Sequence, residues 1–101
     1  MNYSRSDDGG STLLTVNGQL DALTARELRP VLDSLGEAST VRAITVDLSA
    51  LRLIDGSGVG ALVRLYRRVR AHGGTVRIVG LAAQPLLIFK LLGLDRILAP
   101  R

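Results

Sequence analysis

The sequence predicts an α/β fold, with one domain over residues 1–101 that has a mixed, mostly parallel sheet, an N-terminal antiparallel hairpin and about three packed helices. Three observations carry this prediction. Segments with the two-residue alternation of strands alternate along the chain with segments of helical periodicity, as in folds built from right-handed crossovers. Glycine-rich turn signals separate these segments. The 101 residues are 47% hydrophobic and 22% charged, which is typical of a folded domain with its own core.

The first third of the chain predicts a hairpin and then an amphipathic helix. The stretch "SDDGGST" over 6–12 holds Asp-Gly and Gly-Gly, which favour a tight turn between antiparallel strands. Further on, Thr24 and Glu27 have the spacing of a helix capping box. Pro30 is expected to bend the helix or to delay its regular part. One face of this helix is apolar and predicted to be buried, namely Leu28, Val31, Leu32 and Leu35.

The remaining elements are strands and helices in turn. "VRAITVDLSAL" over 41–51 alternates as a strand does, and the helix after "DGSG" is expected to end at Gly73. One side of that helix is apolar, namely Val59, Leu62, Val63, Tyr66 and Val69. "TVRIVG" over 75–80 predicts a strand, "QPLLIFKLLG" over 84–93 a helix and "DRIL" over 95–98 a short final strand. The residues expected to be buried in the sheet and its covering helix are Val46, Leu48, Leu62, Val63, Val76 and Ile78.

The helix predicted after Pro85 is apolar on two sides. Leu86 and Phe89 fall beside Lys90, opposite the face shared by Leu87, Ile88, Leu91 and Leu92. We therefore predict that Leu86 and Phe89 form an exposed apolar patch that binds a partner or a second copy of the chain in a homodimer. A covering loop is the alternative.

Composition excludes several classes of function. The chain has no cysteine, so it has no disulfide, no thiolate zinc site and no cysteine nucleophile. Its first residues lack the apolar segment of a signal peptide, and the longest apolar stretch, 81–94, is interrupted by Gln84, Pro85 and Lys90. A soluble, cytoplasmic protein without membrane contact is therefore expected.

The net charge of +4 comes almost entirely from arginine, since Lys90 is the only lysine. The arginines are spread along the chain and only 3% of the residues are aromatic, which argues against direct binding of nucleic acid. The stripe of Arg64, Arg67 and Arg68 is expected to be mostly a solvated face, although it could meet an acidic partner.

The stretch "IDGSGVG" leads into a helix and admits several chemistries. Such a loop can cradle a phosphate, present a nucleophile, carry a regulatory phosphate or only make a turn. Ser57 is not in a G-x-S-x-G elbow, and the single histidine, His72, lies about 22 Å away along the helix axis. The loop also lacks the third glycine of a dinucleotide site and the lysine of a P-loop. Ser57 is therefore interpreted as part of a surface that another protein recognises or modifies.

Four motifs together resemble the STAS domain, a family named from sulfate transporters and anti-sigma factor antagonists. They are G-x-L-D at 18–21, D-L-S at 47–49, I-D-x-S-G at 54–58 and G-L at 93–94. The resemblance runs from about Leu13 to Leu98. Because no transmembrane transporter domain is attached, the nearer likeness is to the free-standing bacterial antagonists.

The resemblance implies an anti-sigma factor antagonist, or anti-anti-sigma factor, that takes part in transcription regulation by partner switching. In that family the unmodified antagonist binds an anti-sigma factor, often a serine kinase of the histidine-kinase-like ATPase fold. The kinase phosphorylates a serine in the antagonist's loop with its own ATP and magnesium, and a serine phosphatase reverses the modification. The resemblance therefore implies a phosphoprotein that is not an enzyme and has no cofactor or metal of its own.

The family's loop carries its phosphoacceptor serine directly after the aspartate, where this chain has Gly56. Ser57 is thus a displaced candidate phosphoacceptor, and a constitutive, unphosphorylated antagonist is the alternative. Asp21 and Asp55 can instead cap their helices, and the loop glycines can serve only the turn. A small-ligand or nucleotide-sensing STAS module is the alternative function, and an enzyme is a weaker one. The partner-binding residues expected are Asp21, Asp55, Gly56, Ser57, Gly58, Leu86 and Phe89.

Overall fold

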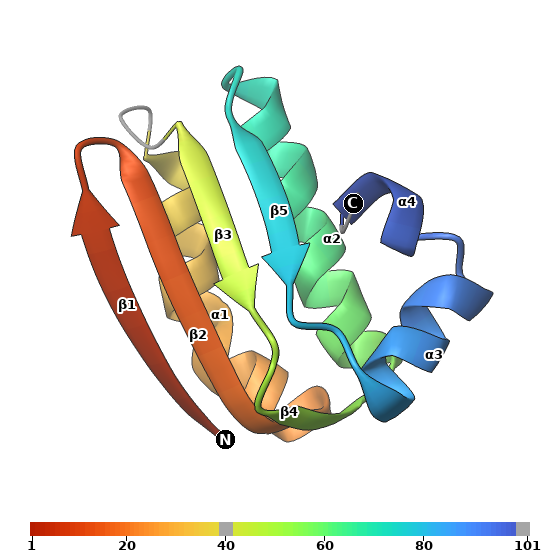
Figure 1. The fold of residues 1–101 in the computed structure, drawn as a ribbon. Coiled ribbons are helices and arrows are strands. Elements are labelled where there is room, and N and C mark those ends of the chain that lie inside the picture. The colour runs from red at the N-terminus through yellow and green to blue at the C-terminus, as the bar shows by residue number, and fades with distance from the viewer. Residues whose placement is uncertain (39–41, 99–101) are drawn as a thin grey trace.

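The computed structural model describes residues 1–38 and 42–98, which form five strands and four helices (Figure 1). Val41, the first residue of the strand predicted at 41–51, lies outside the described residues. In chain order the elements are β1 Asn2–Asp8, β2 Ser11–Leu20, α1 Ala22–Glu37, β3 Ala43–Asp47, β4 Leu51–Ile54, α2 Gly56–Ala71, β5 Thr75–Val79, α3 Ala83–Leu91 and α4 Asp95–Leu98.

The sheet is mixed, which confirms the predicted fold class. β1 pairs antiparallel with β2, and Gly9 (φ 55°) and Gly10 (φ 93°) close the predicted hairpin with the positive φ angles that its turn requires. β2 pairs in parallel with β3, and β3 with β5, which gives the order β1-β2-β3-β5. The end of β2 pairs in parallel with β4, after a register shift between Gly18 and Gln19. The long strand β2 therefore has β3 beside its first half and β4 beside its last three residues.

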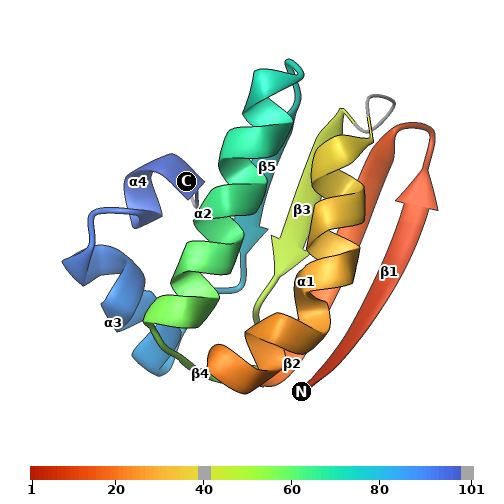
Figure 2. The ribbon, with the colours of Figure 1, turned by 180° about the vertical axis from the view of Figure 1, so that it is seen from behind.

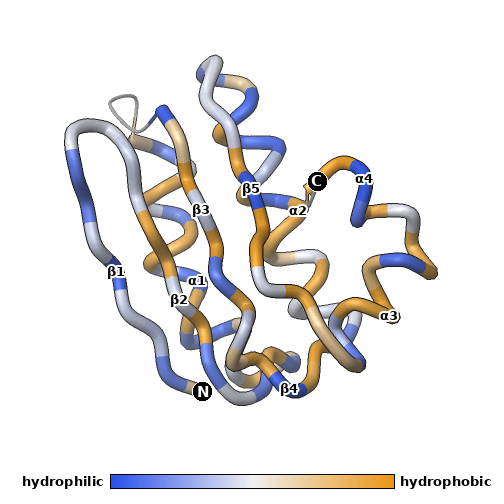
Figure 3. Tube along the Cα trace, viewed as in Figure 1, coloured by the Kyte–Doolittle hydropathy of each residue, from blue (hydrophilic) through white to orange (hydrophobic). Residues whose placement is uncertain are grey.

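Two long helices cover one face of the sheet and leave the other face open (Figures 1 and 2). α1 and α2 pack side by side on this face, whereas α3 contacts β4 and α4 contacts β5. Because successive strand residues point to opposite faces, Leu14 and Val16 of β2 and Ile44 and Val46 of β3 lie buried under the helices. Figure 3 shows the contrast between the apolar central strands and the hydrophilic edge strand β1.

The core confirms most of the predicted burial. Val63 is only half-buried, because it lies at the edge of the α2 face that buries Leu62 and Leu65. α1 is helical from Ala22 to Glu37 with Pro30 inside it, so its regular part is not delayed by the proline. The residues buried as predicted are Leu28, Leu32 and Leu35 of α1, together with Val46, Leu48, Leu62, Val76 and Ile78.

Two predictions about local structure are wrong. The stretch 41–51 is not one strand, because β3 ends at Asp47 and a separate strand, β4, begins at Leu51. The turn between them is fixed by the Ser49 N–H, which donates to Asp47 Oδ1 at 2.9 Å. The last element, 95–98, is the short helix α4 and not a strand.

The predicted apolar patch of Leu86 and Phe89 is also wrong. Phe89 is 0% exposed and belongs to the core, and Leu86 is half-buried. The exposed leucines of this region are Leu87, Leu91 and Leu92, at 55%, 72% and 57% exposure. α3 is apolar around most of its circumference, so its sequence does not define which side faces the core. The structure buries the aromatic ring, which removes the largest apolar surface from water.

Candidate functional site

Two helices begin next to each other at one edge of the sheet. β2 ends at Leu20 and β4 ends at Ile54, and these two residues are register partners. The chain then enters α1 through Asp21 and α2 through Asp55. Both aspartates have extended backbone with φ of −118°, as helix N-caps do. The structure therefore brings two of the predicted site residues, Asp21 and Asp55, to the same edge of the sheet.

Asp21 closes a complete capping box at the start of α1. Its Oδ1 accepts the backbone N–H groups of Leu23 (3.1 Å) and Thr24 (3.0 Å), and Thr24 Oγ1 accepts the N–H of Asp21 at 2.9 Å. The Thr24 hydroxyl also donates to the carbonyl of Gln19 at 2.9 Å. Hydrogen bonds from the Thr24 backbone and then from its side chain lower the pKa of Asp21 from the usual 3.8. The box thus joins Asp21 to Thr24, which corrects the prediction that it joins Thr24 to Glu27.

Asp55 caps α2 with fewer hydrogen bonds than the box at Asp21 has. Its Oδ1 accepts the backbone N–H groups of Ser57 at 2.9 Å and Gly58 at 3.2 Å. The N–H of Asp55 donates to the carbonyl of Leu20 at 3.2 Å, so it is bound to the neighbouring strand and not to a side chain of its own helix. Position 58 has no side chain that could close a box, because it is glycine. The loop "DGSG" therefore forms the first turn of α2 under an aspartate cap.

The two glycines of this loop have different roles. A Cβ at Gly58 would lie 2.5 Å from the carbonyl oxygen of Leu20 and 2.8 Å from Ile54 Cγ1, so only glycine fits between α2 and the ends of β2 and β4. A Cβ at Gly56 would meet nothing within 4 Å. The structure thus contradicts the predicted surface role of Gly58, which is buried against the sheet, and leaves Gly56 and Ser57 exposed.

Ser57 stands at the surface on the first turn of α2. The histidine, His72, is the C-cap at the opposite end of the same helix, so it is not placed to activate the serine. In the part of the chain that the structure describes, His, Cys, Asp and Glu side chains do not gather into a group that could hold a metal ion. The helices formed by residues 1–38 and 42–98 are all too short or too polar to cross a membrane.

Gln84 is a structural residue of the site that the sequence did not reveal. Its Nε2 donates to the carbonyl of Ile54 at 2.9 Å, and its Oε1 accepts the Ile54 N–H at 2.9 Å. The amide of one side chain therefore pairs with β4 as a neighbouring strand would, immediately before Asp55. The preceding residue, Ala83, has φ of 51°, the one positive φ outside glycine among the described residues. Gln84 and Ile54 are 30 positions apart in the sequence, so no local pattern could have indicated their contact.

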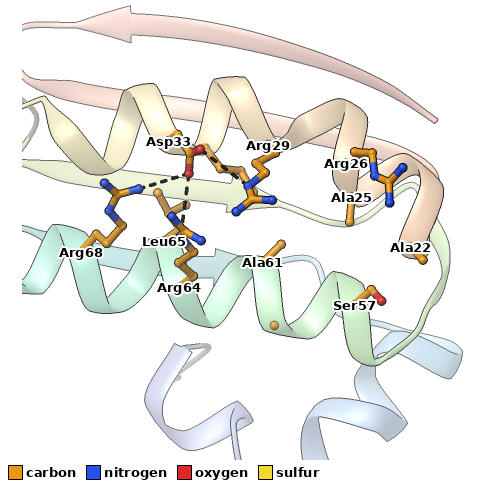
Figure 4. A pocket seen from close by; sticks show the side chains of 12 residues that line it. Ala22, Ala25, Arg26, Arg29, Asp33, Ser57, Ala61, Arg64, Leu65 and Arg68 are labelled. Atoms are coloured by element: carbon orange, nitrogen blue, oxygen red, sulfur yellow. Dashed lines mark hydrogen bonds and ion pairs between the residues drawn. The ribbon is translucent and has the colours of Figure 1, made fainter.

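A groove of about 430 Å³ runs between α1 and α2 and begins at Ser57 (Figure 4). Its walls carry four arginines, two from each helix, and a single aspartate, Asp33. The arginines are Arg26, Arg29, Arg64 and Arg68. The stripe expected from the sequence is therefore divided, because Arg64 and Arg68 line this groove and Arg67 does not.

Known proteins share this arrangement of strands and helices. A family model described as the STAS domain matches residues 4–101. An anti-sigma factor antagonist from Mycobacterium paratuberculosis has a TM-score of 0.84 and 24% identity, over 99% of this chain and 86% of that chain. The Thermotoga maritima protein tm1081 has a TM-score of 0.84 and 22% identity, over 96% and 83%. The Bacillus cell fate determinant SpoIIAA, in its phosphorylated form, has a TM-score of 0.78 and 19% identity, over 93% and 86%.

Proposed function

The chain belongs to the STAS domain family, and from this premise we propose that it is an anti-sigma factor antagonist that acts by binding a protein partner. The observation that carries the proposal is the exposed Gly56–Ser57 turn at the start of α2, which is held by the Asp55 cap and has no histidine base. Proteins with this fold that are named anti-sigma factor antagonists support it. The proposed action requires binding only, with no catalysis and no cofactor.

The proposed contact surface is the edge of the sheet where both helices begin. It consists of Asp21, which is half-buried, and of Asp55, Gly56 and Ser57, which are exposed. The open space around Gly56 allows a partner's backbone to approach closely. The partner is an anti-sigma factor, or a serine kinase of the histidine-kinase-like ATPase fold that acts as one. Gly58 and Phe89 are not part of this surface, because both are buried.

Phosphorylation of Ser57 is the proposed regulation of this surface. A phosphate would add about −1.5 to −2 charges beside the Asp55 carboxylate. The N-terminus of α2 would stabilise that charge within the antagonist by about 0.3–1 kcal/mol at an exposed position. A partner packed against the turn would have to desolvate the phosphate, so binding weakens while the fold is kept. A serine phosphatase would then restore binding. SpoIIAA, which shares the fold, has been solved in unphosphorylated and phosphorylated forms.

The experiment that tests the function uses capture followed by a binary measurement. Tagged wild type, Ser57→Ala and Ser57→Asp are used to capture partners from the native cell, and any anti-sigma factor found is purified for calorimetric titration. We expect wild type and Ser57→Ala to bind with equal affinity and Ser57→Asp to bind at least about tenfold more weakly. Ser4→Asp, an equal charge change on the exposed strand β1, is the control and should bind as wild type does.

Two outcomes would contradict the proposal at different levels. If none of the captured proteins is an anti-sigma factor that binds the purified antagonist, the function itself is wrong. If Ser57→Asp binds as tightly as wild type, the Gly56–Ser57 turn is not the contact surface. Incubation of the wild type with a captured kinase and ATP, followed by mass spectrometry, tests the modification separately. An unmodified Ser57 with intact binding would identify a constitutive antagonist.

A further inference from the structure

We propose that the groove between α1 and α2 is a docking site for an acidic helical segment of a partner protein. The groove begins at Ser57 and extends from the Gly56–Ser57 turn along α1 and α2 (Figure 4). The proposal does not require that Ser57 is phosphorylated or that the partner is an anti-sigma factor. The proposal depends on the shape of the groove floor and on which of the four arginines form hydrogen bonds within the described residues.

The floor of the groove is made of small and apolar side chains. Ala25 of α1 faces Ala61 of α2 (Figure 4), and Ala22, Gly60, Leu32 and Leu65 also line the groove. The lining residues of α1 run from 22 to 33, which corresponds to about 16 Å of helix, or three turns. Small residues along two neighbouring helices leave room for the side chains of a third helix to rest between them. The groove thus has the length and floor that suit a helical segment.

Among residues 1–38 and 42–98, Arg68 is the one arginine of the four that forms side-chain hydrogen bonds. Arg68 donates to Asp33 Oδ1 and to Glu37 Oε1, at 3.1 Å each, and is 31% exposed. Its stem lies against Gly36, where a Cβ would come within 3.2 Å of Arg68 Cβ. Arg68 is therefore a link between α1 and α2 that the fold itself uses.

The other three arginines donate no side-chain hydrogen bond to any residue that the structure describes, so their N–H groups can bind a ligand. Arg29 and Arg64 lie 3.8 and 3.9 Å from the oxygens of Asp33, which is an ion pair but too long for a hydrogen bond. Their side chains are 62% and 52% exposed. Arg26 forms no ion pair with any residue of 1–38 and 42–98. Asp33 is the one acidic residue among the described residues that line the groove, and it pairs with Arg29, Arg64 and Arg68, so the groove carries excess positive charge.

The spacing of these arginines favours a protein segment over a small anion or nucleic acid. Arg29, Arg64 and Arg68 gather around Asp33, whereas Arg26 stands about one turn nearer the start of α1, so the positive charge extends along the groove beyond one point. Carboxylates three or four residues apart on a helix have the same spacing and can pair with arginines on each wall. No aromatic residue lines the groove, so nucleic-acid bases have no stacking surface there.

The test uses a synthetic helical peptide of about 14 residues, with a face of Ala and Leu flanked by Glu on both sides, and a matched peptide with Gln in place of Glu. Binding to the full chain is measured by fluorescence anisotropy, at low ionic strength and in about 0.5 M salt. Arg29→Gln/Arg64→Gln should weaken binding of the acidic peptide by about tenfold. Arg42→Gln/Arg77→Gln, which removes the same charge from exposed positions that do not line the groove, should leave binding unchanged.

A second variant tests the shape of the groove without changing its charge. A Cβ at Gly60 meets nothing within 4 Å, so Gly60→Leu can place a side chain in the groove without a clash with the fold. It should weaken binding by about tenfold while all arginines remain. Circular dichroism confirms that each variant is folded, so that lost binding reports on the groove.

Five results would overturn the proposal. Equal loss in Arg42→Gln/Arg77→Gln would show attraction by net charge alone. Equal affinity for the Gln peptide, or full binding to Gly60→Leu, would show that the peptide does not lie in the groove. Competition by inorganic phosphate at equal concentration would identify a small-anion site, and stronger competition by duplex DNA a nucleic-acid site. None of these results depends on the anti-sigma factor experiment.

Discussion

The two long helices begin with the same residue in the same conformation, yet their first turns are stabilised differently. Asp21 and Asp55 both have φ of −118° and both accept two backbone N–H groups. At α1 the third residue after the aspartate is Thr24, whose hydroxyl closes the box. At α2 the corresponding residue is Gly58, which is packed against the carbonyl of Leu20. The first turn of α1 is held by a full capping box, and that of α2 by its aspartate cap together with close packing on the sheet.

The difference supports the proposal that the second turn is the contact surface. The polar groups at the start of α1 are bonded to one another, since Thr24 reaches both Asp21 and Gln19. At the start of α2, the packing of Gly58 fixes the backbone from below, and Gly56 and Ser57 stay exposed above it. A partner can therefore approach a rigid backbone without first breaking intramolecular hydrogen bonds, which lowers the entropic cost of binding.

The largest effect is expected from Gly58→Ala, which breaks the packing that holds the start of α2. The added methyl group would lie 2.5 Å from a backbone oxygen that cannot move away without shifting β2. We expect a loss of about 2–3 kcal/mol in the free energy of unfolding, measured by urea denaturation. Gly60→Ala, in the same helix but in open space, is the control and should stabilise by about 0.5–1 kcal/mol. Equal stability of Gly58→Ala and wild type would show that the contact with Leu20 is not limiting.

Gln84→Leu is expected to have the next largest effect, because it removes the two hydrogen bonds that hold β4 before Asp55. The N–H and carbonyl of Ile54 would lose partners at 2.9 Å, at a cost of about 1–2 kcal/mol in the free energy of unfolding. Hydrogen exchange should become faster at the Ile54 amide and stay unchanged at the Thr24 amide, which Asp21 protects. Gln19→Leu, at an exposed position of β2, is the control. Unchanged exchange at Ile54 would contradict the role given to Gln84.

Thr24→Val is expected to have a smaller effect, confined to the start of α1. Valine keeps the shape of threonine but cannot accept the Asp21 N–H or donate to the Gln19 carbonyl. The free energy of unfolding should fall by about 1 kcal/mol. Thr15→Val, on the open face of β2, should not destabilise, since valine is well accepted in strands. A Thr24→Val variant as stable as wild type would mean that the hydroxyl contributes nothing to the box.

The sequence predicts those parts of the fold that are determined locally. The hairpin follows from glycines that accept positive φ, and the buried faces of α1 and α2 follow from clear amphipathic periodicity. The sequence predicts helix capping as an alternative to partner binding for Asp21 and Asp55, because a cap depends on residues no more than three positions away. The resemblance to a known family rests on short local motifs for the same reason, three of them at the ends of strands and one, at 93–94, after α3.

The failures concern contacts that form only when distant segments meet. The sequence predicts one strand over 41–51 and does not indicate β4 as a separate strand, because "DLSALRLI" has no glycine or proline to mark the turn. The predicted orientation of α3 is wrong, because nearly all its residues are apolar and do not define the face that is buried. Gln84 contacts a strand 30 residues away, and Arg68 contacts Asp33 across 35 residues. The hydrogen bonds between Gln84 and Ile54 and the groove between α1 and α2 could therefore be identified only from the structure.

The smallest expected effect is the pH dependence of the α1 box. Because the pKa of Asp21 is lowered in the fold, the ionised carboxylate is favoured by folding, and its contribution to stability is fully present above the usual 3.8. As the pH falls below 3.8 and through the lower pKa of the folded state, that contribution is lost. Asp21→Asn keeps an acceptor for the N–H groups of Leu23 and Thr24 but cannot ionise.

Urea midpoints of wild type and Asp21→Asn should therefore differ most at neutral pH and approach each other as the pH falls below about 3.8. Asp7 also has a lowered pKa, through its hydrogen bonds with Thr12 and then Arg5, and it titrates in the same acid range. Because Asp7 is unchanged in both proteins, its titration cancels from the difference between them. A difference that stays constant from neutral to acid pH would show that the charge of Asp21 adds nothing to the hydrogen bonds of the box. The two helix starts would then differ in the hydrogen bonds of the Thr24 hydroxyl and in how closely they pack on the sheet.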